Sequence, residues 1–267
     1  MHDLGPSVAG HGADTPRLPL TPSSPRSVLA RWFDSWMRLL GMALVLFLII
    51  RTFLLEAFQI PSGSMERTLL VGDFLFVNKA VYGAQIPGTS ARLPGFNTPR
   101  RGDVIVFAYP KDPSLSYVKR VVGAPGDIVE MRIGQVYVNG RALEEPYVQR
   151  QDPLHDGFDP KFNWQREYLV PPPDGGQREY LVPTVDQRRG YHPTRDTWGP
   201  LRVPMDKYFV LGDNRDNSED SRYWGFVDVS AVKGRPLVVY FSYERGTHDA
   251  LPWLTDIRWS RLGSLIH

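Results

Sequence analysis

Residues 58–70, Phe-Gln-Ile-Pro-Ser-Gly-Ser-Met-Glu-Arg-Thr-Leu-Leu, lie just beyond the most hydrophobic run of the chain. Pro61 restricts one backbone angle and Gly63 frees another, so this stretch can present a serine hydroxyl on a defined turn. Composition alone favours an ordinary turn at the end of a strand. Ser62 and Ser64 become functional candidates only through what the rest of the chain supplies.

The composition excludes several classes of protein and site. A chain of 267 residues can hold one large domain or two small ones. Its formal net charge of +2 gives no reason to expect a nucleic-acid partner. The absence of cysteine excludes a thiol nucleophile, disulfides and thiolate metal sites. With 24 glycines and 24 prolines, the chain favours turns and β-structure over long helices.

The amino-terminal part predicts a tail and a membrane anchor. Residues 1–35 are rich in proline, glycine and serine at their start and are expected to form a disordered tail, followed by an anchor at 36–56. The apolar run 39–55, interrupted by Arg51, spans roughly 25 Å as a helix, and its flanking residues can extend it. A buried core helix is the alternative. A cleaved secretory signal is disfavoured because no small-x-small site follows the run.

The orientation of this anchor follows from its flanking charges. Arg17, Arg26, Arg31 and Arg38 precede the run, whereas Arg51 and Arg67 lie within or after it. The positive-inside rule then predicts a cytoplasmic amino end and an exported remainder.

Short β-type runs dominate the chain from residue 74 onwards. Their spacing predicts a mainly antiparallel β domain formed by residues 57–148 and 204–245, with a C-terminal tail at 246–267. Asn139-Gly140 is expected to form a two-residue hairpin turn. The predicted strands are 74–77, 103–107, 117–122, 128–133, 135–138, 208–211 and 237–242.

Residues 149–203 break this pattern and are expected to be a loop-rich insert. Within it, Gln-Arg-Glu-Tyr-Leu-Val-Pro occurs at 165–171 and again at 177–183. The two copies could pair as a hairpin around the intervening Asp-Gly, but a tandem duplication in a tolerant loop is favoured.

A serine nucleophile needs a base, and Lys119 is a better candidate than any histidine. The six histidines lie near the chain ends or in loop-like surroundings. Lys119 and Arg120 interrupt an apolar strand, so they must point to opposite faces and one charge is directed inward. An edge strand with two solvated charges is the alternative.

Three separated motifs resemble type I signal peptidases. They are Ile-Pro-Ser-Gly-Ser-Met at 60–65, Tyr-Val-Lys-Arg-Val-Val-Gly at 117–123 and Gly-Asp-Asn-Arg-Asp-Asn-Ser at 212–218, in that order. The resemblance implies that Ser64 is the nucleophile and Lys119 the general base. It implies that Ser62 joins the backbone N–H of Ser64 in an oxyanion hole. It also implies three residues that support the lysine, namely Ser218, Asp220 and Arg222.

The same resemblance implies the fold and the activity. The expected protein is a membrane-bound serine endopeptidase that removes N-terminal signal peptides after small-x-small sites, without cofactor or metal. Its partners would be signal-peptide-bearing secretory precursors and membrane lipid, with no inference about oligomeric state. Its place would be the bacterial inner (cytoplasmic) membrane, crossed once. The residues expected to line the substrate pockets are Ile60, Met65, Leu69, Tyr117 and Val118.

The sequence departs from the family pattern at two positions, and two other functions remain as alternatives. Arg67 stands where the pattern has proline, and Ala57 replaces a proline expected after Glu56, so both changes should loosen the backbone there. One alternative is a self-cleaving Ser/Lys regulator, which would normally carry a DNA-binding module. The other is an anchored β domain that binds without catalysis. Neither a calcium loop nor a zinc-protease motif is complete in this sequence.

Overall fold

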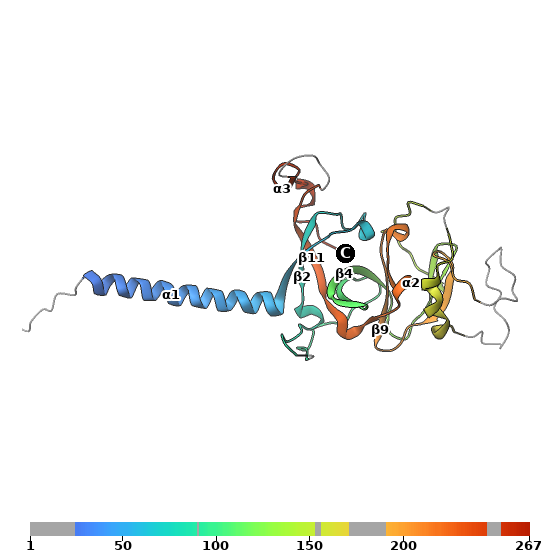
Figure 1. The fold of residues 1–267 in the computed structure, drawn as a ribbon, viewed down its shortest axis with the longest axis horizontal. Coiled ribbons are helices and arrows are strands. Elements are labelled where there is room, and N and C mark those ends of the chain that lie inside the picture. Colours follow the sequence, from blue (N-terminus) through green and yellow to red (C-terminus); the bar gives the residue numbers. More distant parts are fainter. Residues whose placement is uncertain (1–24, 90, 153–155, 171–190, 245–251) are drawn as a thin grey trace, which may run out of the picture. The chain divides into compact units, whose positions relative to one another are not determined.

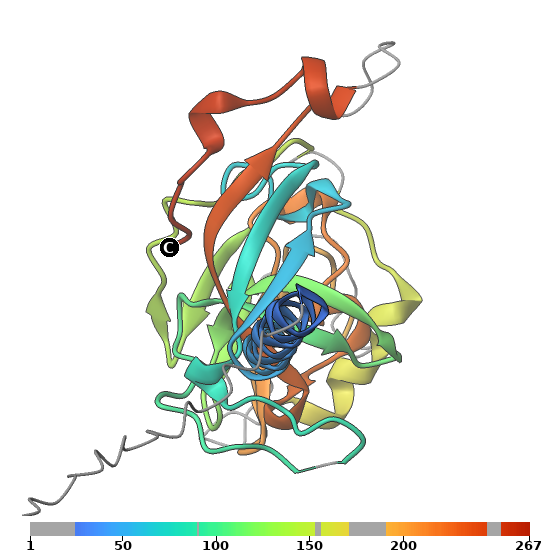
Figure 2. The ribbon, with the colours of Figure 1, turned by 90° about the vertical axis from the view of Figure 1, so that its left-hand side faces the viewer.

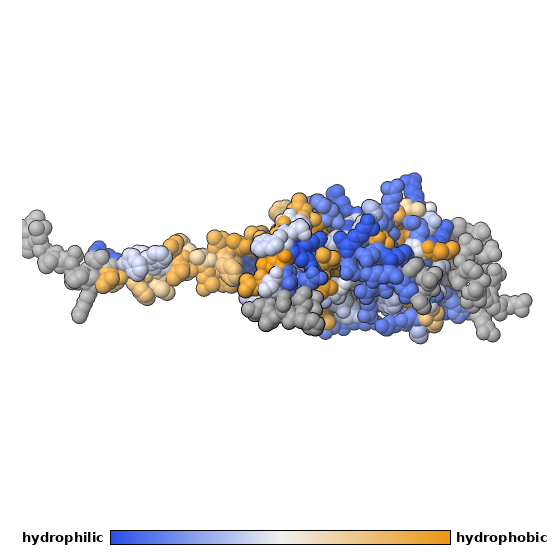
Figure 3. All heavy atoms as spheres, turned by 90° about the horizontal axis from the view of Figure 1, so that it is seen from above, coloured by the Kyte–Doolittle hydropathy of each residue, from blue (hydrophilic) through white to orange (hydrophobic). Residues whose placement is uncertain are grey.

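The computed structural model describes residues 25–89, 91–152, 156–170, 191–244 and 252–267. The chain divides into two units, Met1–Phe47 and Leu48–His267. The described residues of the first unit all belong to helix α1 (Pro25–Ile49). This helix continues as one turn of the wider π-helix over Ile50–Leu54. The stretch Leu29–Leu54 is long and apolar enough to cross a membrane, and hydrophobic side chains cover much of its surface (Figure 3).

The helix starts earlier than the anchor expected at 36–56. Residues 25–35, which the sequence placed in the tail, form its first turns. Pro25 suits the first turn of a helix, where its missing N–H is not needed, and no proline or glycine follows before Gly41.

Two antiparallel sheets form the second unit (Figure 1). The larger has seven strands in the order β1-β2-β11-β3-β4-β9-β10, and the smaller has four in the order β7-β6-β5-β8. In the larger sheet β2 and β11 run side by side, as Figure 2 also shows. The strands of the larger sheet are β1 (Leu55–Gln59), β2 (Asp73–Asn78), β3 (Val104–Tyr109), β4 (Asp112–Gly123), β9 (Lys207–Leu211), β10 (Val227–Asp228) and β11 (Val232–Ser242).

The smaller sheet confirms the predicted hairpin turn and adds an unexpected one. Its strands are β5 (Ile128–Arg132), β6 (Gln135–Val138), β7 (Arg141–Ala142) and β8 (Trp198–Arg202). Asn139 and Gly140 have φ values of 52° and 78° and join β6 to β7, as a type I′ turn requires. Ile133 and Gly134 make the corresponding turn between β5 and β6, with φ values of 48° and 79°. A β-branched residue is strained in this region, which explains why the sequence did not indicate this turn.

All seven predicted strands are present, and the mainly antiparallel β fold is confirmed. The end of the expected insert differs from the prediction, because β8 belongs to the smaller sheet and pairs with β5. Gly199 and Pro200 inside β8 look like turn residues in the sequence, yet Trp198 and Leu201 are buried in the core. Burial of these two large side chains outweighs the low strand preference of glycine and proline.

The expected C-terminal tail is partly packed against the larger sheet. Ile266 is buried in the same core cluster as Val239, and its N–H donates to Leu237 O at 3.1 Å. The described part of this segment also contains helix α3 (Pro252–Thr255). Residues 165–168 of the first copy of the repeat form the end of a 3₁₀ helix, Pro160–Tyr168, and Leu169 makes a single antiparallel bridge with Leu201 of β8. The second copy lies outside the described residues, so the pairing of the copies stays untested.

Candidate active site

The nucleophile candidate Ser64 lies on a tight turn anchored in the core. Residues Gly63–Met65 form one turn of 3₁₀ helix after β1, and Ser62 before it is extended with a φ of −132°. Met65 and Leu69 are fully buried beneath this turn, and Leu69 N donates to Met65 O at 2.7 Å. Burying a side chain of this size contributes about 2 kcal/mol, so each one strongly favours the turn.

A second segment, the loop 212–218, packs against the turn that carries Ser64. Asn214 donates its backbone N–H to Ser64 O at 3.1 Å and its side-chain amide to Gly63 O at 3.2 Å. A Cβ atom on Gly212 would lie 2.5 Å from Ser64 O and 2.2 Å from Ser218 Oγ. Only glycine permits this close approach, which fixes the backbone of Ser64 relative to the loop.

The strand β4 directs Lys119 and Arg120 to opposite faces, and both are buried. β4 lies between β3 and β9, and the two side chains are only 4% and 3% exposed. Arg120 makes two hydrogen bonds with Asp213, at 2.9 and 2.8 Å, and its guanidinium lies over the ring of Tyr147. The alternative of an edge strand with two solvated charges is therefore wrong.

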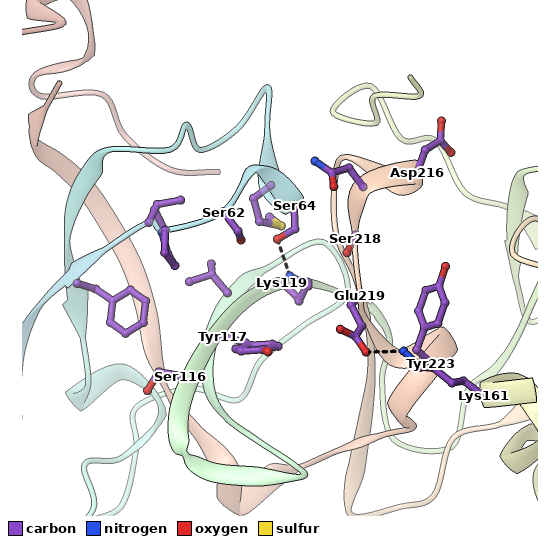
Figure 4. Close-up of a pocket in the computed structure, with 16 residues that line it drawn as sticks. Ser62, Ser64, Ser116, Tyr117, Lys119, Lys161, Asp216, Ser218, Glu219 and Tyr223 are labelled. Atoms are coloured by element: carbon purple, nitrogen blue, oxygen red, sulfur yellow. Dashed lines mark hydrogen bonds and ion pairs between the residues drawn. The ribbon is translucent and has the colours of Figure 1, made fainter. Parts of the chain in front are cut away.

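On the other face of β4, Lys119 contacts the candidate nucleophile directly. Its Nζ lies 2.6 Å from Ser64 Oγ in a hydrogen bond (Figure 4). Burial lowers the pKa of Lys119 to about 8, although the carboxylate of Asp220 opposes this effect. The positive charge of Arg222 lowers the same pKa further. A lysine in this environment is neutral far more often than a solvated one, so it can accept a proton.

The expected supporting residues form one buried network beside the lysine. Ser218 Oγ donates to Asp220 Oδ2 at 2.8 Å, and Arg222 Nε donates to Asp220 Oδ1 at 2.8 Å. Gly212 N donates to the same carboxylate at 3.1 Å. Burial alone would raise the pKa of Asp220, but the charge of Arg222 and these hydrogen bonds hold it below its ordinary value. Asp220 is therefore ionised, and it ties the loop to helix α2 (Ser221–Trp224).

An open cleft of about 590 Å³ contains the Ser64–Lys119 contact. Four of the five residues expected to form pockets line it, namely Ile60, Met65, Tyr117 and Val118, and Ser62 does so too. Leu69 does not, because the chain turns between Met65 and Leu69 and sends that side chain into the core. No histidine among the described residues lines the cleft.

The sequence missed part of the cleft wall. The further lining residues are Phe58, Pro61, Ser116, Lys161, Asp216, Asn217, Glu219 and Tyr223. Most of these lie within a few residues of a recognised motif, which was the available signal. Lys161 comes from the insert, where no motif points to it.

Comparison with known proteins identifies the family of this chain. Residues 33–241 match the family model described as signal peptidase, peptidase S26. The chain belongs to the signal peptidase family. It is 38% identical over 238 residues to a signal peptidase I of Pseudomonas aeruginosa, covering 84% of this chain and 76% of that protein. A signal peptidase I of Aquifex aeolicus is 34% identical over 220 residues, covering 73% of this chain and 79% of the relative.

A solved signal peptidase I structure from Enterococcus faecalis V583 also matches, at 31% identity. The match covers 52% of this chain and 97% of the Enterococcus faecalis chain, with a TM-score of 0.32. Membership of the signal peptidase family rests on the sequence match, and the antiparallel architecture is observed directly.

Arg67, which stands where the signal peptidase family pattern has proline, adopts a positive φ. Arg67 has a φ of 82°, whereas proline is restricted to about −65°. Thr68 N donates to Met65 O at 3.0 Å across this turn, and Arg67 Nη1 donates to Val148 O at 3.1 Å. A proline could not adopt this φ, so the backbone conformation at residue 67 requires a residue other than proline. Ala57 lies in β1 and pairs with Phe76.

Proposed function

We propose that this chain is a membrane-anchored serine endopeptidase that removes N-terminal signal peptides from secretory precursors. The observation that carries the proposal is the buried Lys119, with its lowered pKa, at 2.6 Å from Ser64 Oγ. An anchored domain that binds without catalysis would not need this pair in an open cleft. A self-cleaving Ser/Lys regulator would need the pair, but it would normally carry a DNA-binding module and not an apolar membrane anchor. The apolar stretch Leu29–Leu54 supplies the anchor.

In the proposed mechanism, neutral Lys119 removes the proton from Ser64 Oγ as that oxygen attacks the scissile carbonyl. The negative oxygen that develops accepts hydrogen bonds from Ser64 N–H and Ser62 Oγ–H. The lysine, now an ammonium, gives its proton to the departing amine of the mature protein. It then activates the water that hydrolyses the acyl-enzyme. Asp220, held by Arg222 and Ser218, fixes the surroundings of the lysine through both steps.

The cleft and the anchor support the proposed substrate. Ile60, Met65, Tyr117 and Val118 provide shallow apolar walls that suit the small side chains before the cut. The charges that flank the helix support a cytoplasmic amino end and an exported catalytic unit. The similarity to bacterial signal peptidases supports the bacterial inner membrane as the location. Contact with lipid follows from such an anchor.

The test uses the full chain in detergent with a precursor that carries alanines at the first and third positions before the cut. Ser64→Ala should abolish cleavage because it removes the attacking hydroxyl. Lys119→Arg should also abolish cleavage, because a guanidinium cannot deprotonate in a protein. Wild-type kcat/KM should rise as the pH increases through about 8, where Lys119 loses its proton. An active Lys119→Arg enzyme would refute the proposed base.

A further inference from the structure

The cleft has two arms of opposite chemistry that meet at Ser64 and Lys119. The apolar arm consists of Phe58, Ile60, Tyr117 and Val118, three of which share one hydrophobic cluster. The polar arm consists of Lys161, Asn217, Glu219 and Tyr223. Figure 4 shows Tyr117 on one side of Lys119, and Lys161, Glu219 and Tyr223 on the other. An extended peptide cut at Ser64 therefore meets different surfaces before and after the cut.

The insert holds Lys161 in the polar arm through buried contacts. Trp164 Nε1 and Gln165 Nε2 both donate to the backbone oxygen of Arg222, at 3.0 and 3.2 Å. The ring of Phe162 packs against that of Tyr223 with centroids 5.0 Å apart. The helix Pro160–Tyr168 is thus fixed to α2, which carries the arginine of the catalytic network. Lys161 is therefore positioned by the fold, although its own side chain is solvated.

Lys161 and Glu219 are charges that a substrate can reach. Lys161 Nζ lies 3.3 Å from Glu219 Oε1, and the two side chains are 59% and 54% exposed. Asp216 also lines the cleft, but its side chain is only 2% exposed and lies close to Arg150 and Arg195. An exposed ion pair is weak, so either partner can be exchanged for a substrate charge at little cost.

We propose that Lys161 and Glu219 bind the first residues after the cut and select precursors by the charge of those residues. This rests on the proposed function, in which the segment before the cut has small and apolar side chains. Such a segment fits the apolar arm, which leaves the mature side in the polar arm. An acidic residue there pairs with Lys161, and a basic residue pairs with Glu219. Lys161, a residue of the insert, thereby becomes a determinant of specificity.

The test compares two peptides that share the segment before the cut and differ only in glutamate or lysine among the first four mature positions. The measured quantity is the ratio of kcat/KM for the glutamate peptide to that for the lysine peptide. Glu219→Lys should raise this ratio, and Lys161→Glu should lower it, each by about three- to fivefold at low salt. Raising the ionic strength should shrink both effects.

Two controls separate local contact from general charge. Lys207→Glu makes the same charge change at a partly exposed lysine that also has a carboxylate partner, Asp228, and lies outside the cleft lining. Its ratio should equal that of the wild type. The double exchange Lys161→Glu with Glu219→Lys keeps the ion pair and should bring the ratio back to within about twofold of wild type.

The outcomes distinguish this inference from the proposed function. If the wild type cleaves both peptides and the ratio does not move in either single variant, the polar arm does not contact the mature side. Equal shifts in Lys207→Glu would also overturn the inference, because they would indicate long-range charge only. Failure of the wild type to cleave any peptide would instead refute the proposed function.

Discussion

Replacing Lys119 with methionine should abolish activity and yet stabilise the protein near neutral pH. The lysine is 4% exposed, and burial lowers its pKa from 10.5 to about 8. The unfolded chain therefore binds the proton more tightly than the folded chain does. Below pH 8 this difference opposes folding by about 3 kcal/mol, which is 1.36 kcal/mol for each unit of the lowered pKa. Methionine has a similar shape and carries no charge to bury.

The gain in the free energy of unfolding from Lys119→Met should be smaller than about 3 kcal/mol and should depend on pH. Methionine loses the hydrogen bond to Ser64 Oγ, which offsets about 1 kcal/mol and leaves a net gain near 2 kcal/mol at pH 7. Between pH 8 and 10.5 the folded lysine has lost its proton while the unfolded one keeps it, so wild-type stability rises. The advantage of Lys119→Met should therefore fall by about 2 kcal/mol between pH 7 and 9.5.

Guanidinium unfolding of the detergent-solubilised chain, followed by tryptophan fluorescence, measures both quantities. Lys207→Met serves as the control, because it removes a lysine outside the cleft and retains the buried one. A Lys119→Met protein that is less stable than wild type at pH 7 would refute the reasoning. So would an advantage that stays constant up to pH 9.5, since the buried charge would then not be its cause.

Four further predictions test the backbone and the insert. Ile133→Asn should raise the free energy of unfolding by about 1 kcal/mol, because asparagine tolerates the φ of 48°; an unchanged melting temperature would contradict the strained turn. Gly212→Ala should lower kcat by about a hundredfold, because its Cβ must displace Ser64 or Ser218; wild-type kcat would show that the loop yields freely. Gln165→Ala should destabilise the chain by about 1–3 kcal/mol, because it removes the buried Gln165 Oε1 to which the Tyr191 hydroxyl donates. Deleting residues 165–176 should instead leave the melting temperature near wild type, since the second copy of the repeat then follows Trp164 directly.

Local signals in the sequence were sufficient for the seven predicted strands and for the hairpin turn at Asn139-Gly140. Alternating apolar residues mark the core face of a strand, and Asn139-Gly140 favours positive φ whatever surrounds it. Where local preference and packing disagree, the prediction missed the element. β8 was missed because Gly199 and Pro200 have a low preference for strands. The turn at Ile133 was missed because isoleucine disfavours positive φ, and the pairing of β5 with β6 imposes that conformation.

The sequence by itself determined the order of the three motifs, the apolar helix and the fact that Lys119 and Arg120 face opposite ways. These depend on chain order and on backbone geometry over a few residues. Only the tertiary structure decided that Lys119 faces Ser64, that Leu69 leaves the cleft and that Lys161 enters it. Ser64 and Lys119 are 55 residues apart, and their contact depends on how β4 packs against the turn and the loop 212–218. The lowered pKa of Lys119 depends on that burial, which no pattern of neighbouring residues encodes.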